Sequence, residues 1–363
     1  MRVLIATGGT GGHIYPALSL AKALKEENSA NEFYFIGSKN RMEATEIPQA
    51  GYAYQGIDVI GMNGSIFSKL KSLWLLKKAE KECKEIIKKF NPDIVIGFGN
   101  YISVPVLLAA HALHIPTMIH EQNSYAGKAN KMLANVADAI VGCYEENMEQ
   151  FPKNKTRILG NPRASEAAKI TVNNQIMKDL GFDPEKPFVV LVMGSLGSET
   201  VNNVLKQASK KMNQKAYQVL IVTGRKCYDD FIQDATESEN VKIVPYIDGL
   251  ATMALADLVV VRGGATTSAE ITALGIPSII IPSPYVPNNH QVKNALSLQN
   301  KQAAIMLEEK DCTADALVDK IDFILSNSEL REEMKKQAKM MGRPHASQDI
   351  IQWINDLVGG NNG

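Results

Sequence analysis

Short apolar runs alternate with longer segments of helical periodicity along most of the chain. In the first half, buried strands are predicted at residues 3–7, 33–36, 94–96, 117–120 and 139–141. In the second half, they are predicted at 187–192, 219–222, 241–245, 258–261 and 278–281. Helical patterns lie between them, for example at 15–27, within 61–90 and at 128–136. This alternation predicts an α/β fold with parallel sheets and right-handed crossovers.

One arrangement of residues occurs twice in the chain. Residues 93–119 and 257–281 each contain a buried strand, a glycine turn, a helical run and a second strand entered through proline. Strand–glycine–helix units also open each half, at 3–13 and 189–198. The sequence therefore predicts two Rossmann-like halves, and we expect a ligand in the cleft between their sheets.

The length of 363 residues favours two domains over a single core. Residues 160–162 (Gly-Asn-Pro) and the polar stretch 170–187 mark the expected linker region. The segment 329–358 has a helical pattern that Pro344 should break or kink. We predict an N-terminal domain of residues 1–162, completed by a C-terminal helix in 343–363, and a C-terminal domain of residues 163–342.

The composition narrows the range of partners. Because 39 basic and 39 acidic residues cancel, no overall field attracts nucleic acid. The first apolar run meets glycine too early for a signal peptide, and no stretch approaches the ~18 apolar residues of a membrane span. The widely spaced cysteines indicate reduced thiols and no zinc site. A cytoplasmic location is expected.

Residues 8–13 (Gly-Gly-Thr-Gly-Gly-His) form a glycine loop between a predicted strand and helix. Such a loop lets backbone N–H groups approach a phosphate at a helix N-terminus. A dinucleotide fingerprint does not fit, because Ile14 occupies the third glycine position and Lys39 stands near the expected acidic residue. The alternative is a tight turn without a ligand, with His13 packing or capping the helix. The glycine-rich setting favours His13 as a base.

Two loops of the second half have similar chemistry. Residues 193–198 (Met-Gly-Ser-Leu-Gly-Ser) offer a hydroxyl and N–H groups at a helix start, so Ser195 is interpreted as a phosphate ligand. Residues 262–270 place Thr266 at another helix start, where a diphosphate is favoured, and Glu270 where a carboxylate can bind ribose hydroxyls. Helix capping by Thr266 or Thr267, with Glu270 completing a capping box, is the structural alternative. Residues 120–123 (His-Glu-Gln-Asn) and His290-Gln291 follow predicted strands, where a parallel sheet presents functional groups.

Taken in order, these motifs resemble the MurG family, the bacterial N-acetylglucosaminyltransferases that make lipid II. The similarity covers nearly the whole chain through Gly-Gly-Thr-Gly-Gly-His, His-Glu-Gln-Asn, Gly-Asn-Pro-Arg, Gly-Ser-Leu-Gly-Ser, Arg-Gly-Gly-Ala-Thr-Thr-x-Ala-Glu and Asn-His-Gln. It implies a GT-B fold and metal-independent, cofactor-free, inverting transfer from UDP-N-acetylglucosamine to the muramyl 4-hydroxyl of lipid I. By position, it implies donor contacts from Thr10, Gly11, Gly12, Asn123, Arg163, Ser195, Ile247, Thr266, Glu270 and Gln291.

The chain departs from the family pattern at two positions. Met193 stands where many members have glycine, and Arg163 follows Pro162 directly where many have an intervening valine. For the transfer step, we interpret His13 as the general base, with Glu121 as the competing base or as its orienting partner.

A lipid acceptor requires contact with the cytoplasmic face of the cell membrane. Residues 65–78 carry apolar side chains at helical spacing beside several lysines, including Ile66, Phe67, Leu70 and Trp74. A basic amphipathic helix with tryptophan suits an anionic lipid surface, which predicts a peripheral membrane protein. A core-facing helix with a solvated lysine face fits the same periodicity.

Two other classes of function remain open from the residues alone. Another GT-B enzyme, such as a glycolipid synthase or a UDP-N-acetylglucosamine 2-epimerase, would use the same donor without lipid I. A non-catalytic subunit that binds a nucleotide sugar would be expected to lose the candidate base, whereas His13 and Glu121 are present.

Overall fold

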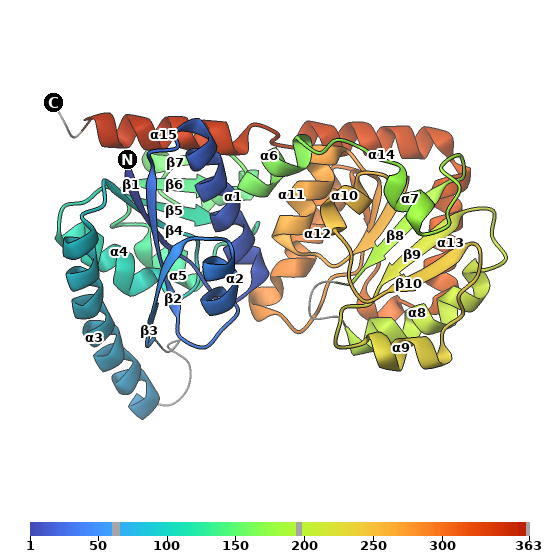
Figure 1. The fold of residues 1–363 in the computed structure, drawn as a ribbon, viewed down its shortest axis with the longest axis horizontal. Coiled ribbons are helices and arrows are strands. Elements are labelled where there is room, and N and C mark those ends of the chain that lie inside the picture. The colour runs from blue at the N-terminus through green and yellow to red at the C-terminus, as the bar shows by residue number, and fades with distance from the viewer. Residues whose placement is uncertain (60–65, 194–197, 361–363) are drawn as a thin grey trace. The chain divides into compact units, whose positions relative to one another are not determined.

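The computed structural model describes residues 1–59, 66–193 and 198–360, and of residues 66–74 only the backbone (Figure 1). The chain forms two compact units. Unit 1 comprises Met1–Ser165 and His345–Gly363, and unit 2 comprises Glu166–Pro344. The predicted domain limits were residues 162 and 342. The polar stretch 170–187, expected as linker, lies in unit 2 and includes a short helix, α7 (Gln175–Asp179).

Unit 1 is built on a seven-stranded sheet in which every pair of neighbouring strands is parallel. Its strands are β1 (Arg2–Ala6), β2 (Glu32–Ser38), β3 (Ala53–Ile57), β4 (Ile94–Gly97), β5 (Thr117–Glu121), β6 (Ala139–Gly142) and β7 (Thr156–Ile158). Their order is β3-β2-β1-β4-β5-β6-β7. The pattern did not predict β3 and β7, because β3 is mostly half-buried and β7 has three residues.

Helices cover both faces of this sheet (Figure 1). They are α1 (Gly11–Glu27), α2 (Glu43–Gln49), α3 (Ile66–Phe90), α4 (Ser103–Ala112), α5 (Lys128–Leu133), α6 (Pro162–Ala168, across the unit boundary) and α15 (Ala346–Gly360). Alternate residues of β1 join different cores. Val3 and Ile5 pack in the core that α1 and α15 cover, whereas Leu4 and Ala6 pack in the core that α3 and α4 cover. This alternation is the two-residue period of a strand buried on both faces.

Unit 2 repeats the plan with a six-stranded parallel sheet in the order β10-β9-β8-β11-β12-β13. The strands are β8 (Phe188–Val192), β9 (Gln218–Val222), β10 (Val241–Val244), β11 (Leu258–Val261), β12 (Ser278–Ile280) and β13 (Ala304–Met306). The main helices are α8 (Glu199–Met212), α9 (Tyr228–Asp234), α10 (Gly249–Met253), α11 (Ala265–Leu274), α12 (His290–Asn300), α13 (Ala314–Ser326) and α14 (Ser328–Met341). The predicted parallel α/β architecture is confirmed in both units.

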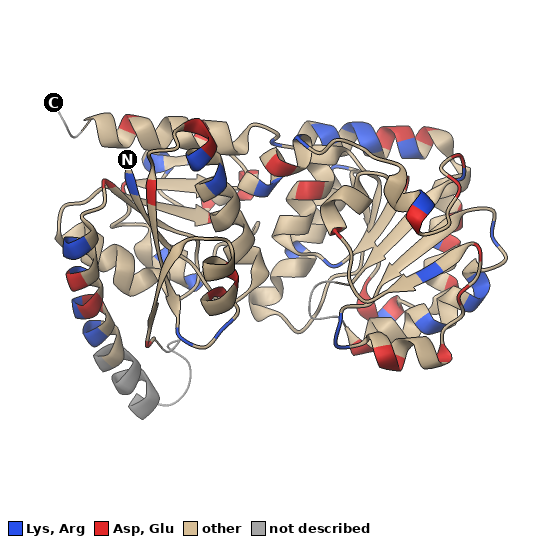
Figure 2. Cartoon of the chain, viewed as in Figure 1, with Lys and Arg blue, Asp and Glu red and all other residues tan. Residues whose placement is uncertain are grey.

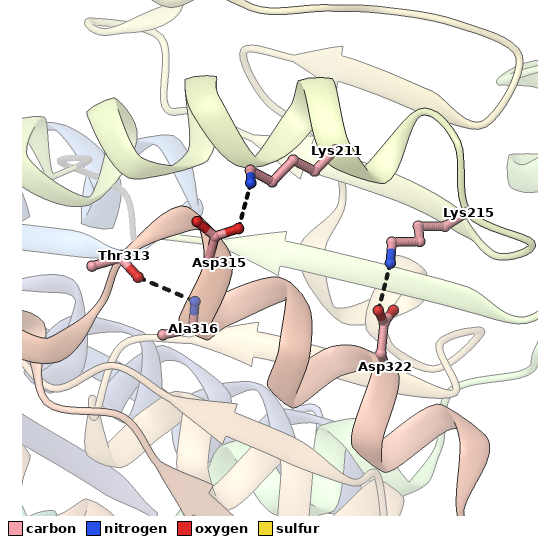
Figure 3. A network of polar contacts seen from close by, with 6 residues as sticks. All are labelled: Lys211, Lys215, Thr313, Asp315, Ala316 and Asp322. Carbon is pink, nitrogen blue, oxygen red and sulfur yellow. Dashed lines mark hydrogen bonds and ion pairs between the residues drawn. The ribbon is translucent and has the colours of Figure 1, made fainter.

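Ion pairs join two of the helices of unit 2 at their solvent side (Figure 3). Lys211 of α8 pairs with Asp315 of α13, and Lys215, beyond the end of α8, approaches Asp322 to 2.6 Å. Thr313 caps α13 by accepting a hydrogen bond from the Ala316 N–H at 3.1 Å. Partly exposed pairs of this kind contribute little to stability, so the apolar face of α13 holds the two helices together.

Charges of both signs follow each other along α14 and along the second half of α3 (Figure 2). In the described part of α3, Ala79, Cys83 and Ile87 are buried against the sheet, while Lys81 and Lys88 are exposed. This part is therefore a core-facing helix with a solvated lysine face. The predicted break in the last helical segment is confirmed, since α14 ends at Met341 and α15 begins at Ala346.

Candidate active site

The strand order reverses once in each unit, and the loops that carry Thr10 and the helix start of Thr266 follow strands at these points. The reversal lies between β1 and β4 in unit 1 and between β8 and β11 in unit 2. Ligands of open α/β sheets bind outside the carboxyl ends of the strands at such a switch point. Residues 7–10, 98–102 and 262–264 follow β1, β4 and β11, and residues 194–197, which follow β8 and Met193, lie outside the described residues.

A buried carboxylate fixes the position of the first glycine loop, residues 8–12. Glu43 of α2 is fully buried and accepts hydrogen bonds from the Gly9 N–H at 3.0 Å and the Ser38 N–H at 3.1 Å. The Ser38 hydroxyl donates a third bond, at 2.5 Å. The Gly9 N–H is therefore committed to the protein. Because α1 begins at Gly11, and not near Tyr15 as predicted, Gly11, Gly12 and His13 belong to the first turn of a helix.

The hydroxyl of Thr10 is directed at His13. Thr10 occupies the N-cap position of α1, where a threonine commonly bonds the backbone, yet it makes no capping bond. Its Oγ1 lies 3.1 Å from His13 Nδ1 instead. The tautomer in which Nδ1–H donates to Thr10 carries its lone pair on His13 Nε2, the arrangement that a base requires.

The turn after β4 approaches this histidine closely. A Cβ on Gly99 would lie 3.1 Å from His13 Cδ2 and 3.3 Å from His13 Nε2, and Gly99 has a φ of +74°. Only glycine adopts this conformation without strain while leaving room for the imidazole. Asn100 secures the turn, because its Nδ2 donates to the Gly8 carbonyl at 2.8 Å.

Glu121 lies at the end of β5 and is 2% exposed. Its Oε1 accepts from the backbone and side-chain N–H groups of Asn123, at 3.0 and 3.3 Å. Its Oε2 accepts from the Gly127 N–H and from Asn130 Nδ2, both at 2.9 Å. Burial raises the pKa of this carboxyl, against the lowering effect of those donors. Glu121 thus anchors the 121–130 loop and positions Asn123, a role that supports the loop rather than proton transfer.

His120 is buried beside Glu121 and stacks on Phe98, with ring centroids 4.9 Å apart. Its Nε2 lies 3.0 Å from the Gly160 carbonyl, which assigns the proton to Nε2. Burial, with a smaller contribution from the nearby His13, lowers the pKa of His120 to about 4, against the raising effect of the hydrogen bond to Gly160. At neutral pH the His120 ring is therefore uncharged. Cys143, 3.7 Å from the same nitrogen, has a pKa raised well above the ordinary thiol value by burial, so it is no nucleophile.

In unit 2, Glu270 and Thr266 are on α11. The N-cap of this helix is Gly264, which has no side chain, so Thr266 and Thr267 occupy the second and third helical positions. The capping-box interpretation is therefore wrong, because Glu270 lies beyond the position that such a box requires. Glu270 is 6% exposed.

Gly263 brings the start of α11 against the start of α12. A Cβ at this position would lie 2.4 Å from the carbonyl oxygen of Gln291, and Asn294 Nδ2 donates to the Gly263 carbonyl at 3.1 Å. Gln291 Oε1 accepts from the Ser283 N–H at 2.8 Å, which holds the proline-rich loop over this helix start. Unit 2 therefore places Gln291 next to the turn that precedes Thr266 and α11.

Two other predicted donor contacts lie in the loop after β10 and at the start of α6. Ile247 is half-buried after β10, next to the exposed Tyr246, whose ring lies 4.8 Å from the Arg225 guanidinium. Arg163 is half-buried at the start of α6, and its N–H donates to Asn161 Oδ1 at 3.0 Å. Ser195 lies outside the described residues, as do the side chains of Ile66, Phe67, Leu70 and Trp74.

Sequence patterns missed several residues that shape these sites. Glu43 lies on α2, which the pattern did not predict, and Gln122 and Asn130 support the end of β5. Arg262 and Glu309 form a nearly buried pair at 2.6 Å, joining the ends of β11 and β13. The motif His-Glu-Gln-Asn at residues 120–123 included Gln122, but nothing in the sequence indicated its contact with Phe98. Within the described residues, no group of three or more His, Cys, Asp or Glu side chains is placed to hold a metal ion.

Comparison with known proteins decides the family. The glycosyltransferase family 28 N-terminal domain matches residues 3–141, and the family 28 C-terminal domain matches residues 188–350. The UDP-N-acetylglucosamine–N-acetylmuramyl-(pentapeptide) pyrophosphoryl-undecaprenol N-acetylglucosamine transferase of Bacillus cytotoxicus is 42% identical over 99% of this chain and 100% of its own length. The chain belongs to the MurG family. It is a glycosyltransferase of the GT-B class, as the resemblance implied.

Solved structures agree with the fold of the MurG family. The crystal structure of Acinetobacter baumannii MurG is 26% identical, with a TM-score of 0.79, and the match covers 98% of this chain and 99% of that one. A putative UDP-N-acetylglucosamine 2-epimerase from Listeria monocytogenes is 14% identical over 98% and 96% of the two chains, with a TM-score of 0.71. At that identity the likeness shows a shared fold alone. The described part of this MurG-family chain has no helix long and apolar enough to cross a bilayer.

Proposed function

We propose that this protein transfers N-acetylglucosamine from UDP-N-acetylglucosamine to the muramyl 4-hydroxyl of lipid I, with inversion, to give lipid II. The observation that carries this proposal is the 42% identity to the Bacillus cytotoxicus transferase over essentially both full lengths. That enzyme's name states the donor and the undecaprenol-linked acceptor. The 2-epimerase alternative rests on a 14% identity and receives no comparable support.

In the proposed reaction, unit 1 supplies the base. His13 Nε2 takes the proton of the acceptor hydroxyl while the acceptor oxygen forms a bond to the anomeric carbon of the donor sugar. The bond from that carbon to the diphosphate oxygen breaks, and its electron pair leaves with UDP. His13 later returns its proton to water. The Thr10 hydroxyl, 3.1 Å from Nδ1, can accept the Nδ1–H of the tautomer that carries its lone pair on Nε2.

In unit 2, α11 supplies donor contacts. Its first N–H groups and Thr266 would face the diphosphate, where the positive end of a helix stabilises the charge that develops on UDP. The buried Glu270 would accept hydrogen bonds from the ribose hydroxyls. Ser195, Arg163, Ile247 and Gln291 complete the proposed donor contacts, together with Thr10, Gly11, Gly12 and Asn123 of unit 1.

The decisive experiment incubates the protein with labelled UDP-N-acetylglucosamine, with and without lipid I. Label is expected in a lipid product only when lipid I is present. A free sugar released without lipid I would identify an epimerase, and binding without turnover would identify a non-catalytic subunit. Either result contradicts the proposal.

The variant Glu270→Ala provides a second arm of this assay. Loss of the ribose contact should weaken UDP binding about tenfold or more, as measured by calorimetry, because a charged acceptor would be lost from a buried position. Unchanged UDP affinity in Glu270→Ala would remove Glu270 from the donor site. The overall transfer reaction would remain testable with the wild-type protein.

We further propose that the protein acts as a peripheral protein on the cytoplasmic face of the cell membrane. The proposal rests on the sequence of the first turns of α3, with Ile66, Phe67, Leu70 and Trp74 among lysines. Apolar side chains at the headgroup boundary combine with basic charge to bind anionic lipid.

Vesicle co-sedimentation tests this surface. The double variant Phe67→Glu/Trp74→Glu should bind vesicles of anionic phospholipid about tenfold more weakly than wild type, since two apolar contacts are replaced by charges that the lipid repels. A matched control places glutamate at Phe323 and Met340, which are exposed apolar residues of unit 2. Equal binding by wild type and both double variants would contradict the proposed surface.

A further inference from the structure

Gln122 is a buried residue of unit 1 that no step of the proposed reaction uses. Its side chain is 2% exposed, and its Nε2 donates to the Phe98 carbonyl at 3.2 Å. That bond fixes the orientation of the amide, so Oε1 must point away from Phe98. Among the described residues, Oε1 has no hydrogen-bond partner. A buried acceptor without a donor is rare in folded proteins and calls for an explanation.

The orphaned oxygen lies on the same side of Gly99 as the His13 ring. A Cβ on Gly99 would lie 3.5 Å from Gln122 Oε1 and 3.3 Å from His13 Nε2. Because Gly99 has no side chain, nothing from this residue fills the space between the amide and the imidazole. His13 and Gln122 therefore converge on one small volume, although they come from α1 and from the end of β5.

We infer that Gln122 is a positioning residue for His13, whose carbonyl oxygen stabilises the imidazolium that forms during transfer. This inference rests on the proposed function, in which Nε2 takes the proton of the acceptor hydroxyl. The imidazolium carries N–H groups on both nitrogens. Thr10 Oγ1 accepts from Nδ1, and Gln122 Oε1 presents the negative end of an amide dipole towards the Nε2 side of the ring. The oxygen of Gln122, which has no hydrogen-bond donor in the resting enzyme, thus lies where its dipole stabilises the positive charge that His13 acquires.

Other ionisable groups near His13 do not supply this stabilisation. His120, on β5, is uncharged at neutral pH, so it supplies no negative charge to an imidazolium at His13. Both oxygens of Glu121 accept N–H bonds from its own loop, and Glu43 on α2 is engaged by Gly9 and Ser38. The alternative role for Gln122 is purely structural, since its Nε2 fastens the end of β5 to the end of β4.

The test compares the pH at which His13 titrates in wild type, Gln122→Met and Gln122→Glu, using NMR of labelled imidazoles. Gln122→Met removes the oxygen and should lower the His13 titration by about one pH unit, because hydrogen bonds to charged groups have about that strength. Gln122→Glu keeps the size of the side chain and should raise the pH at which His13 titrates, because it adds a negative charge. The acidic limb of the pH profile for kcat/KM should move in the same two directions.

Gln218→Met is the matched control, because Gln218 is also 2% exposed but has both ends of its amide bonded to Asp183. This substitution should not change the pH at which His13 titrates. Identical His13 titration in wild type and the folded Gln122 variants overturns the inference, and if Gln122→Met does not fold, Gln122→Glu alone decides. Since the NMR readout needs no turnover, a wild-type protein that fails to make lipid II would refute the proposed function separately.

Discussion

His13→Ala is expected to lower kcat for transfer by about 10²–10⁴-fold, the usual contribution of a general base. The acceptor hydroxyl would then have to lose its proton to water while it attacks the anomeric carbon. The fold should tolerate the change, because His13 is half-buried in the first turn of α1. UDP affinity should stay close to wild type, since the proposed ribose contact lies in unit 2. Single-turnover kinetics with calorimetry for UDP separates the two effects.

Thr10→Val sharpens this test. The substitution keeps the shape of the side chain but removes the oxygen 3.1 Å from His13 Nδ1. As Thr10 makes no capping bond to the backbone, the free energy of unfolding should change little, whereas kcat should fall by a smaller factor than in His13→Ala. Near-normal turnover in His13→Ala, with intact donor binding, would eliminate the histidine as the base.

The geometry around Glu121 explains why His13 is preferred as the base. A base needs a lone pair that can reach the substrate proton, and the two Glu121 oxygens already accept four hydrogen bonds from Asn123, Gly127 and Asn130. Its side chain is also 2% exposed. Substituting Glu121 would therefore disturb the loop that carries Asn123, and a loss of activity there would reflect displaced loop geometry.

The sequence was informative where local patterns decide the structure. Buried parallel strands read as continuous apolar runs, so β1, β4, β8 and β11 were predicted close to their observed limits. Glycine turns after those strands predicted ligand-binding loops, but the strand order that places these loops at the switch points needs pairings between distant segments. The break at Pro344 followed from the missing N–H and fixed φ of proline.

The features that escaped prediction depend on contacts between distant segments. Glu43 reaches the glycine loop from α2, and Gln122 and His13 both approach the space beside Gly99. No spacing along the chain encodes these approaches, since the residues meet only when β1, β4 and β5 pair. The capping-box interpretation failed for a related reason. Thr266 and Thr267 are suitable capping residues, but the helix begins earlier, at Ala265 after Gly264.

A second large effect is expected in the pH dependence of stability, and it centres on His120. Burial lowers its pKa from 6.5 to about 4 in the folded protein, so the unfolded chain binds a proton at a higher pH than the native state does. The contribution of His120 to the free energy of unfolding is therefore fully present above about pH 6.5 and is lost as the pH falls towards 4. Since one pKa unit corresponds to about 1.4 kcal/mol, the loss should reach about 3 kcal/mol.

Urea unfolding of wild type and His120→Gln at several pH values between 7.5 and 4 measures this contribution. The difference in unfolding free energy between the two proteins should shrink by about 3 kcal/mol across that range, because glutamine has no charge to bury. Glu121 acts in the opposite direction, as its raised pKa makes stability fall with increasing pH above about 4.5. It is present in both proteins, so its effect cancels in the difference. If the unfolding free energies of the two proteins ran parallel with pH, His120 would accept a proton in the folded protein as readily as in the unfolded chain. Its stacking on Phe98 and its burial argue against that result.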